Sequence, residues 1–336
     1  MLPSELHMLR YEHKAKENGT ILVSLCGFDS IPADIGTFFM ASEVRKRYSS
    51  GLAEVQAFMV GKGSVSGGTI ASGLTMAGAP GSSRMNDPLF LVPKEAVSSV
   101  VGSSDFSFPR QTLGRYSMMF VMSAINTRVV RRSAAIFASR GKALIGHPAF
   151  LPPLHQSSAL QHSYSSAPFC YSEFALMNSF FMSWIATLVL LVVGVCLRIP
   201  GIPKLLSYVV PKPGSGPTDQ QIARNWFQYI FAAKVDSKEG TMLYGRVHGR
   251  DGGYGDTALM LSECGLALAT QRSLLPAVVL GGGFLTPATA FGAILLKRLN
   301  KANLRFEILG SESCAVAAAS SRGPPPPVGQ PSAFQE

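Results

Sequence analysis

The chain has 336 residues, of which 47% are hydrophobic and 15% are charged, and its formal net charge is +10. This hydrophobic fraction suffices for the core of one large domain or two smaller ones, so the composition excludes a wholly disordered chain. The five cysteines are scattered without a CxxC pair, which argues against a zinc site or a disulfide framework and favours a reducing compartment.

The first elements predicted along the chain form an incomplete α/β unit. Residues 5–17 are typical of the end of an amphipathic helix, and residues 21–25 of a buried strand. Such a strand needs parallel neighbours, which the preceding residues do not supply. The later predicted elements are a helix over 31–48, a strand over 53–60, helices over 69–77 and 220–232, a strand over 241–248, helices over 257–271 and 288–300, and a strand over 305–309.

Loops and a tail separate or follow these elements. Residues 147–168 are rich in Pro, Ser and His, and residues 211–217 in Pro and Gly, so both predict loops, and Thr218 can cap the helix after the second loop. Residues 315–336 contain four consecutive prolines and predict a disordered tail.

Residues 179–197 form the most apolar segment, with nineteen residues and no charge. The segment predicts a transmembrane helix or a shallow hairpin in one leaflet, and a buried core helix is the alternative. In a spanning topology the cations that follow it would lie in the cytosol. Those cations are Arg198, Lys204 and Lys212, and the residues that permit bending are Gly194, Pro200, Gly201 and Pro203.

Most of the positive charge lies around this apolar segment. Residues 106–218 carry ten Lys or Arg and one acid, Glu173. Such blocks bind nucleic acid, anionic membranes or anionic ligands. The block has no zinc-finger spacing and no RNA-binding signature, so we expect a lipid surface as partner and no nucleic acid.

Gly61, Gly63 and Gly67 give a G-x-G-x-x-x-G pattern between a predicted strand and a predicted helix. Glycines at such a turn let the backbone approach a pyrophosphate, so all three are candidate cofactor-binding residues. The spacing is one residue longer than in the common fingerprint, and no acid closes a second strand at the expected distance. In an alternative role, Lys62 and the helix N-terminus would hold an anionic group of a substrate.

Gly27, Phe28, Asp29 and Ser30 follow the first predicted strand and precede a helix. Gly27 permits an unusual backbone angle, and Asp29 or Ser30 can cap the helix, so the segment has a structural explanation. It also has a functional one, because ligands of parallel α/β sheets bind where strands end. The four residues are therefore candidate substrate-binding residues.

This segment, extended to Asp34 as Gly-Phe-Asp-Ser-Ile-Pro-Ala-Asp, resembles the saccharopine dehydrogenase-like oxidoreductases. The resemblance covers about residues 10–310, and Phe284 replaces the valine that the family pattern expects. Further landmarks occur in the family's order: Gly-Gly-Thr at 67–69, Val-Val-Arg-Arg at 129–132, the apolar segment, residues 214–218, residues 252–254, and Gly-Phe-Leu-Thr-Pro at 283–287.

The resemblance implies further site residues. Gly68 and Thr69 would begin a helix of the substrate domain, and Thr286 would cap the following helix or contact substrate. From the residues alone, His248 beside Asp251 is a candidate base, but one histidine at a strand end makes no catalytic site. Catalytic residues stay unassigned, and no metal site is expected.

The resemblance also implies the activity and its location. It implies NAD(P)-dependent reduction of a lipid-linked carbonyl or enoyl group, with a role in glycolipid or lipid metabolism. It further implies association with lipid droplets or with membranes, at the cytoplasmic face of the plasma membrane or of organelles, mitochondria included. The alternative is a non-catalytic protein of a lipid-droplet or membrane surface.

The expected fold is α/β with a mixed sheet, a truncated Rossmann-type N-terminal unit and one hydrophobic membrane-associated helix or hairpin. In the family, residues 27–34 follow a complete dinucleotide-binding domain, so we expect this chain to lack most of that domain and to be inactive alone. The expected parts are a nucleotide-domain remnant at 1–26, a substrate domain at 27–146 and 218–310, the loop and apolar segment at 147–217, and a disordered tail at 311–336.

Overall fold

The computed structural model describes residues 11–63, 75, 87–103, 106–152, 163–199, 201–206, 208, 216–236 and 240–320. Its largest feature is a seven-stranded mixed sheet in the order β3-β4-β5-β2-β6-β7-β9. β2 and β5 run parallel, and the other neighbouring strands are antiparallel. The α/β class and the mixed sheet are therefore confirmed. The strands are β2 Leu52–Lys62, β3 Gln111–Thr112, β4 Arg115–Met119, β5 Cys170–Met177, β6 Trp226–Val235, β7 Met242–Gly249 and β9 Arg305–Leu309.

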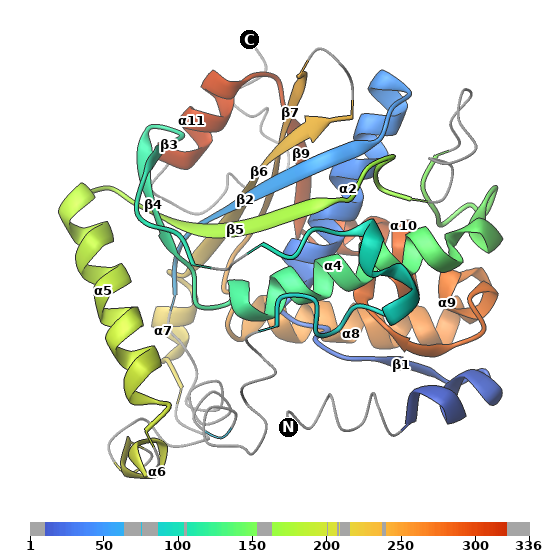
Figure 1. Cartoon of the computed structure of the whole chain (residues 1–336), viewed down its shortest axis with the longest axis horizontal. Helices are drawn as coiled ribbons and strands as arrows, with labels where there is room; N and C mark the ends of the chain where they lie inside the picture. Colours follow the sequence, from blue (N-terminus) through green and yellow to red (C-terminus); the bar gives the residue numbers. More distant parts are fainter. Residues whose placement is uncertain are drawn as a thin grey trace.

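Helices cover both faces of this sheet (Figure 1). On one face, α2 (Ile31–Tyr48) and α4 (Ser123–Arg140) pack on the strands, and α8 (Gly255–Thr270) and α10 (Pro287–Lys301) lie behind them. The main apolar core fills this side. On the other face, α11 (Glu312–Ser320) covers a smaller core. The shorter helices are η2 Lys94–Ser99, η3 Gly141–Leu144, α6 Ile202–Leu206, α7 Asp219–Ile222, η4 Arg272–Leu274 and α9 Pro276–Val279.

A second, two-stranded sheet lies beyond the helix layer. It pairs β1 (Ile21–Val23) in parallel with β8 (Gly283–Leu285), and Figure 1 shows β1 on the side of the helices remote from the large sheet. The strand predicted at 21–25 is therefore confirmed, and its parallel neighbour comes from near the other end of the chain. The division into domains stays a prediction.

The sequence pattern was misleading at residues 220–232, where it predicts a helix. Thr218 caps α7 as expected, but this helix ends at Ile222 and β6 begins at Trp226. β6 lies between β2 and β7 and is buried along most of its length, so both of its faces can be apolar. Pairing with a strand on each side determines the conformation of these residues, and the periodicity of the sequence carries no information about such pairing.

The apolar segment forms α5 (Phe180–Cys196), which packs along β4 and β5 at one side of the molecule (Figure 1). Across the described ranges, no helix is both long enough and apolar enough to cross a membrane. This finding corrects the membrane helix or hairpin in the predicted fold, because the uncharged run of nineteen residues yields a helix of only 17.

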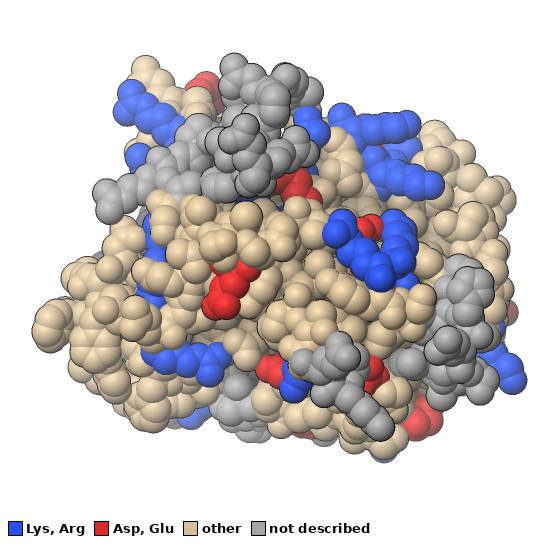
Figure 2. Space-filling model, turned by 90° about the horizontal axis from the view of Figure 1, so that it is seen from above, with Lys and Arg blue, Asp and Glu red and all other residues tan. Residues whose placement is uncertain are grey.

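Much of the basic block lies in the protein interior. Arg115, Arg128, Arg131 and Arg132 are all buried. Arg131, for example, donates hydrogen bonds to the carbonyl groups of Pro88, Ser103 and Tyr171. On the face drawn in Figure 2, Lys and Arg occur in separate groups, some beside acidic residues, and form no continuous patch. Part of the positive charge of residues 106–218 therefore stabilises the interior and is not available to bind a partner.

Candidate functional site

The two strands of the small sheet end at the same edge, because they are parallel and in register. Val23 lies opposite Leu285, the last residue of β8. β1 leads through a turn at residues 26–30 into α2, and β8 leads through Thr286 into α10. We call residues 26–30 the turn site. In parallel α/β sheets this edge, with two helix N-termini, is where ligands bind.

α8 and its preceding loop hold the turn site in place. The Phe28 amide donates to Thr257 Oγ1 at 2.9 Å. The Phe28 and Phe227 rings pack edge to face, with 4.7 Å between their centroids. Two glycines permit this close packing. A Cβ on Gly27 would lie 3.0 Å from Thr257 Cγ2, and one on Gly252 would lie 2.6 Å from the Phe28 ring.

A buried chain of hydrogen bonds runs from the turn site into the large sheet. Ser30 Oγ donates to Asn126 Oδ1 at 3.0 Å, and Asn126 Nδ2 donates to Glu173 Oε1 at 2.8 Å. The hydroxyls of Tyr229 and Tyr171 donate to the two carboxyl oxygens of Glu173 at 3.1 and 3.2 Å. All five residues are buried. These donors provide the partners that a buried carboxylate requires.

The pKa values of the buried residues in this hydrogen-bonded network differ in cause and consequence from that of Asp29 at the surface. Burial, and then the charge of Glu173, hold the pKa of Tyr171 and of Tyr229 well above the usual value, so both hydroxyls stay protonated. Asp29 is exposed on the turn, but nearby atoms partly desolvate its carboxyl group and raise its pKa. The exposed end therefore has a carboxyl that protonates more readily than an ordinary aspartate.

A second buried network joins α2, α4 and α10 through Asp34. Ser133 Oγ donates to Asp34 Oδ1 at 2.5 Å and lies 2.6 Å from Thr286 Oγ1. The Ala288 amide, in the first turn of α10, donates to Asp34 Oδ2 at 2.8 Å. Thr286 also caps α10 in a reciprocal pair with Thr289. The N-terminus of α10 is thus already occupied by a carboxyl group of the same chain.

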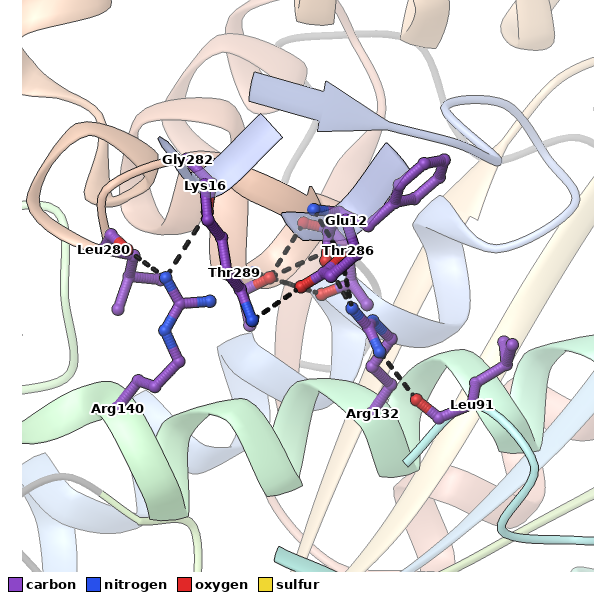
Figure 3. Close-up of polar contacts among 10 residues, drawn as sticks. Glu12, Lys16, Leu91, Arg132, Arg140, Leu280, Gly282, Thr286 and Thr289 are labelled. Carbon is purple, nitrogen blue, oxygen red and sulfur yellow. Dashed lines mark hydrogen bonds and ion pairs between the residues drawn. The ribbon is translucent and has the colours of Figure 1, made fainter. Parts of the chain in front are cut away.

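Arginines of α4 fasten β8 to the helix layer (Figure 3). Arg132 donates to the carbonyl groups of Leu91 and Phe284 at 2.7 and 2.5 Å, and Arg140 donates to the carbonyls of Leu280 and Gly282. Burial lowers the pKa of both guanidinium groups. Glu12 accepts the Phe284 amide at 2.9 Å and lies 3.6 Å from Arg132.

The structure brings part of the predicted site together. Gly27, Phe28, Asp29 and Ser30 share one turn, and Thr286 lies in the neighbouring strand–helix connection as a buried cap. Gly61 and Gly63 are at the end of β2, where Gly61 pairs with Phe227. Gly67, Gly68 and Thr69 lie outside the described residues. The roles predicted for these residues stay predictions: cofactor binding for Gly61, Gly63 and Gly67, and substrate binding for the others.

Sequence reasoning missed Asn126, Glu173 and Tyr229. One signal was available, because Glu173 is the single acid in residues 106–218 and lies within an apolar stretch. An isolated acid that is buried must be paired, so it marks a polar network.

His248 does not pair with Asp251. Its Nε2 lies 3.0 Å from Glu307 Oε1, while Asp251 accepts the side-chain amide of Asn225 at 2.7 Å. The hydrogen bond from His248, and then Arg246, lower the pKa of Glu307 to about 2. Over the part of the chain that the structure describes, no three His, Cys, Asp or Glu are grouped to hold a metal ion.

Relatives of this chain are found among mycobacterial proteins. One from Mycobacterium tuberculosis, provisionally named a trans-acting enoyl reductase, is 30% identical over 318 residues, which cover 88% of this chain and 69% of that protein. The chain belongs to the trans-acting enoyl reductase family. Trans-acting enoyl reductases of Mycobacterium ulcerans and Mycobacterium bovis are 28% and 27% identical, covering 86% of this chain and 67% of each relative. No family model and no solved structure matches it.

The family membership corrects the resemblance to saccharopine dehydrogenase-like oxidoreductases. That resemblance rested on short segments such as residues 27–34 and 283–287. In the structure these segments form a tight turn and a helix cap, which are local solutions for many strand–helix connections. The match to the enoyl reductases extends over 318 residues and decides the family.

Enoyl reductions generally use a nicotinamide cofactor, and neither Gly61 nor the helix starts at the shared edge of β1 and β8 fit its pyrophosphate. A Cβ on Gly61 would lie 2.8 Å from the Trp226 carbonyl oxygen, so this glycine serves close packing within the sheet. The N-terminus of α10 is occupied by Asp34. The first turn of α2 contains the same acid and a proline, which lacks an amide donor. An anion is disfavoured at both helix starts.

We expect Asp34 to make stability depend on pH. Burial outweighs its hydrogen bonds and raises its pKa to about 7, far above the value of about 3.9 in an unfolded chain. Between these values the folded state keeps a proton that the unfolded state releases. The free energy of unfolding should therefore fall as pH rises through this window, by at most about 1.4 kcal/mol per pH unit from this group.

Urea unfolding of the wild type and of Asp34→Asn at several pH values between 4 and 8 tests this expectation, because the neutral amide removes the titration. The difference between the two curves should change across the window. The control is Glu312→Gln, an exposed carboxyl on α11. Parallel curves for the wild type and Asp34→Asn would show that Asp34 is ionised throughout.

Proposed function

We propose that this chain acts in the reduction of an α,β-unsaturated acyl group with NAD(P)H, and that the described part binds the acyl substrate. Family membership supports the reaction class, since the relatives are named as enoyl reductases. The observation that carries the assignment of the site is the shared edge of β1 and β8, where exposed Asp29 directly precedes Ser30, the first member of the buried hydrogen bonds to Asn126 and Glu173.

The chemistry of this edge suits an uncharged acyl group better than an anion. Asp34 already accepts the Ala288 amide at the start of α10, and Asp29 would repel a phosphate whenever it is ionised. A thioester carbonyl needs a hydrogen-bond donor. Asp29 can supply one when it is protonated, which its raised pKa favours. The partly exposed Phe28 ring offers an apolar contact for the acyl chain.

A binding experiment with a small neutral probe tests this role. The probe is a trans-2-enoyl thioester of N-acetylcysteamine, and its affinity is measured by calorimetry. Asp29→Ala should weaken binding about tenfold, equivalent to about 1.4 kcal/mol, because the donor is lost. Asp29→Asn should retain most of the affinity, because an amide also donates.

The matched control is Glu312→Ala, on the opposite face of the large sheet. Wild-type affinity should also fall as pH rises and Asp29 loses its proton, whereas the Asp29→Asn variant should show no such change. Equal affinity of the wild type and Asp29→Ala, or no binding of the probe, would refute the assignment of the turn site.

We further expect the chain alone to bind NADH and NADPH weakly and to reduce no enoyl thioester, because neither the start of α2 nor that of α10 fits the pyrophosphate. Titration of the purified protein, followed by nicotinamide fluorescence, measures this. Micromolar binding that is lost in Gly63→Val would restore the glycine pattern as a cofactor site, since Gly63 has open space for the larger side chain. Micromolar binding that survives the substitution would point to the edge of β1 and β8.

A second candidate function is that of a non-catalytic protein of a lipid surface, and the orientation of α5 favours it. Its buried residues are the polar Ser183 and Thr187, whereas Phe181, Leu188 and Val192 are 75%, 60% and 53% exposed. This burial pattern is the reverse of that of an ordinary surface helix. We propose that the apolar face of α5 rests on an anionic lipid surface without crossing it.

Neighbouring residues are consistent with such a contact. Phe108, 61% exposed, stacks on Trp184 with 5.6 Å between ring centroids, and amphipathic rings favour the membrane interface. Arg198 and Lys204 are exposed beyond the C-terminal end of α5. One basic side chain near an anionic surface contributes about 1 kcal/mol, so the apolar face would supply most of the affinity.

Vesicle flotation tests the second candidate. The protein should float with vesicles of phosphatidylcholine and phosphatidylserine, and the double variant Leu188→Asp with Val192→Asp should stay in the soluble fraction. The control is Leu261→Asp, which changes a leucine of α8 that is likewise 60% exposed. Concentration-dependent dimers that do not float, and that the double variant abolishes, would assign the α5 face to a second copy of the chain instead.

A further inference from the structure

A cavity of about 340 Å³ opens between α8 and α10, two helices that pack against each other. We call it the α8–α10 cavity. None of its described lining residues belongs to the turn site or to the buried network beneath it. Its polar lining comes from the C-terminal half of α8 and from the last turns of α10, namely Glu263, Gln271, Lys297, Arg298 and Lys301.

Arg298 is held in the wall of this cavity by two contacts. Its Nε donates to Glu263 Oε2 at 2.6 Å, and its Nη1 donates to Gln271 Oε1 at 3.0 Å. The Arg298 side chain is 23% exposed, and among the described residues its Nη2 has no hydrogen-bond partner. The guanidinium group is therefore already oriented, and one of its nitrogens is left to donate to a ligand.

The two partners of Arg298 shape the chemistry of the cavity. An arginine is only a donor, so the Gln271 side chain must turn its oxygen toward Arg298, which leaves the amide nitrogen as a further donor. No bond from this nitrogen to another described residue is formed. The charge of Glu263 is balanced by Arg298, so the two lysines give the cavity its net positive charge.

Lys297 and Lys301 are exposed, and neither forms an ion pair within the described part of the chain. They are four residues apart, so they share one face of α10, and like charges at this spacing destabilise a helix. Cations in a last turn often bond to the terminal carbonyl groups. Here the carbonyls of Leu299 and Asn300 accept backbone amides of the chain that follows. The contacts within the protein therefore do not explain the lysine pair.

We propose that the α8–α10 cavity binds the phosphate group of a small organic ligand. The three terminal oxygens of a phosphate monoester can accept from Arg298 Nη2, from the Gln271 amide and from the two lysines, whose charges match its own. A carboxylate has fewer oxygens and one charge, so it would leave donors unused. A volume of this size is typical of small-molecule sites, and Ile294 and Ala302 offer the uncharged remainder an apolar contact.

Calorimetry at neutral pH and low ionic strength tests the site, with inorganic phosphate and phenyl phosphate as probes. Phenyl phosphate should bind more tightly, because its ring can contact Ile294 and Ala302. The double variant Lys297→Gln with Lys301→Gln should bind both probes at least about tenfold more weakly, because two charge-assisted contacts are lost. Equal affinity of the wild type for the two probes would refute an organic ligand.

The matched control is the double variant Lys142→Gln with Lys234→Gln, which removes the same charge from exposed lysines of η3 and β6. Its affinity should equal that of the wild type. Equal weakening in both double variants would reduce the effect to general charge attraction and overturn the site. Absence of saturable binding would overturn it too, and would leave Arg298 as a structural link between α8 and α10.

A soluble phosphate ester and a phospholipid headgroup share this chemistry, and flotation distinguishes them. The vesicles contain phosphatidylcholine and phosphatidic acid, and the protein carries Leu188→Asp with Val192→Asp so that α5 does not contribute. Flotation that is lost when Lys297 and Lys301 are also changed to Gln would assign the site to a lipid headgroup. Binding of phenyl phosphate without flotation would assign it to a soluble ester.

The site is independent of the acyl-binding role of the turn. Affinity for the enoyl thioester of N-acetylcysteamine should be the same in the wild type and in the double variant Lys297→Gln with Lys301→Gln. Failure of this neutral probe to bind would count against the turn site alone, and failure of both phosphate probes would count against the α8–α10 cavity alone.

Discussion

The two strand–helix connections of the candidate site, β1 to α2 and β8 to α10, both depend on the contacts of the Asp34 carboxyl group. It lies on α2, accepts Ser133 of α4 and caps the N-terminus of α10. α2 follows β1 and α10 follows β8, so this one group joins the two strand–helix connections at the edge where a ligand would bind. A two-stranded parallel sheet is marginal alone. Its geometry is maintained by the helices, and the helices are joined to each other by a buried acid.

α4 makes polar contacts with the turn site, with Asp34 and with the chain around β8. From its N-terminal to its C-terminal end, Asn126 reaches the turn site, Arg132 donates to the Phe284 carbonyl of β8, Ser133 reaches Asp34, and Arg140 donates to the Gly282 carbonyl just before β8. A helix that packs by apolar contacts alone could slide or rotate. The polar contacts, which are costly unless paired, specify one position. The interior arginines therefore determine geometry rather than surface charge.

Local chemistry made some features predictable, and distant contacts made others unpredictable. The helix α2 was predicted from the sequence and is confirmed, but the local rules invoked for the turn before it were wrong. Gly27 adopts no left-handed backbone angle, and Ser30 makes no side-chain cap but donates to Asn126 instead. β6 was misassigned because its neighbours β2 and β7 determine it, and residues 226–235 do not contain that information. Glu173 was visible as an isolated acid, but its partners Asn126 and Tyr229 come from separate elements. The acyl-binding role that we propose for the turn rests on this assembly.

Electrostatics at the shared edge indicate what this part of an enoyl reductase can accept. In many nucleotide-binding folds the helix start after a parallel strand is free and attracts phosphate. Here the start of α10 is filled by Asp34, and the turn before α2 presents Asp29. Neither group offers an anion the free amide donors or positive charge that it needs, and both are easier to protonate than an ordinary aspartate. Such a setting suits a neutral carbonyl better than a pyrophosphate, which is why we propose the acyl group as the ligand of this edge.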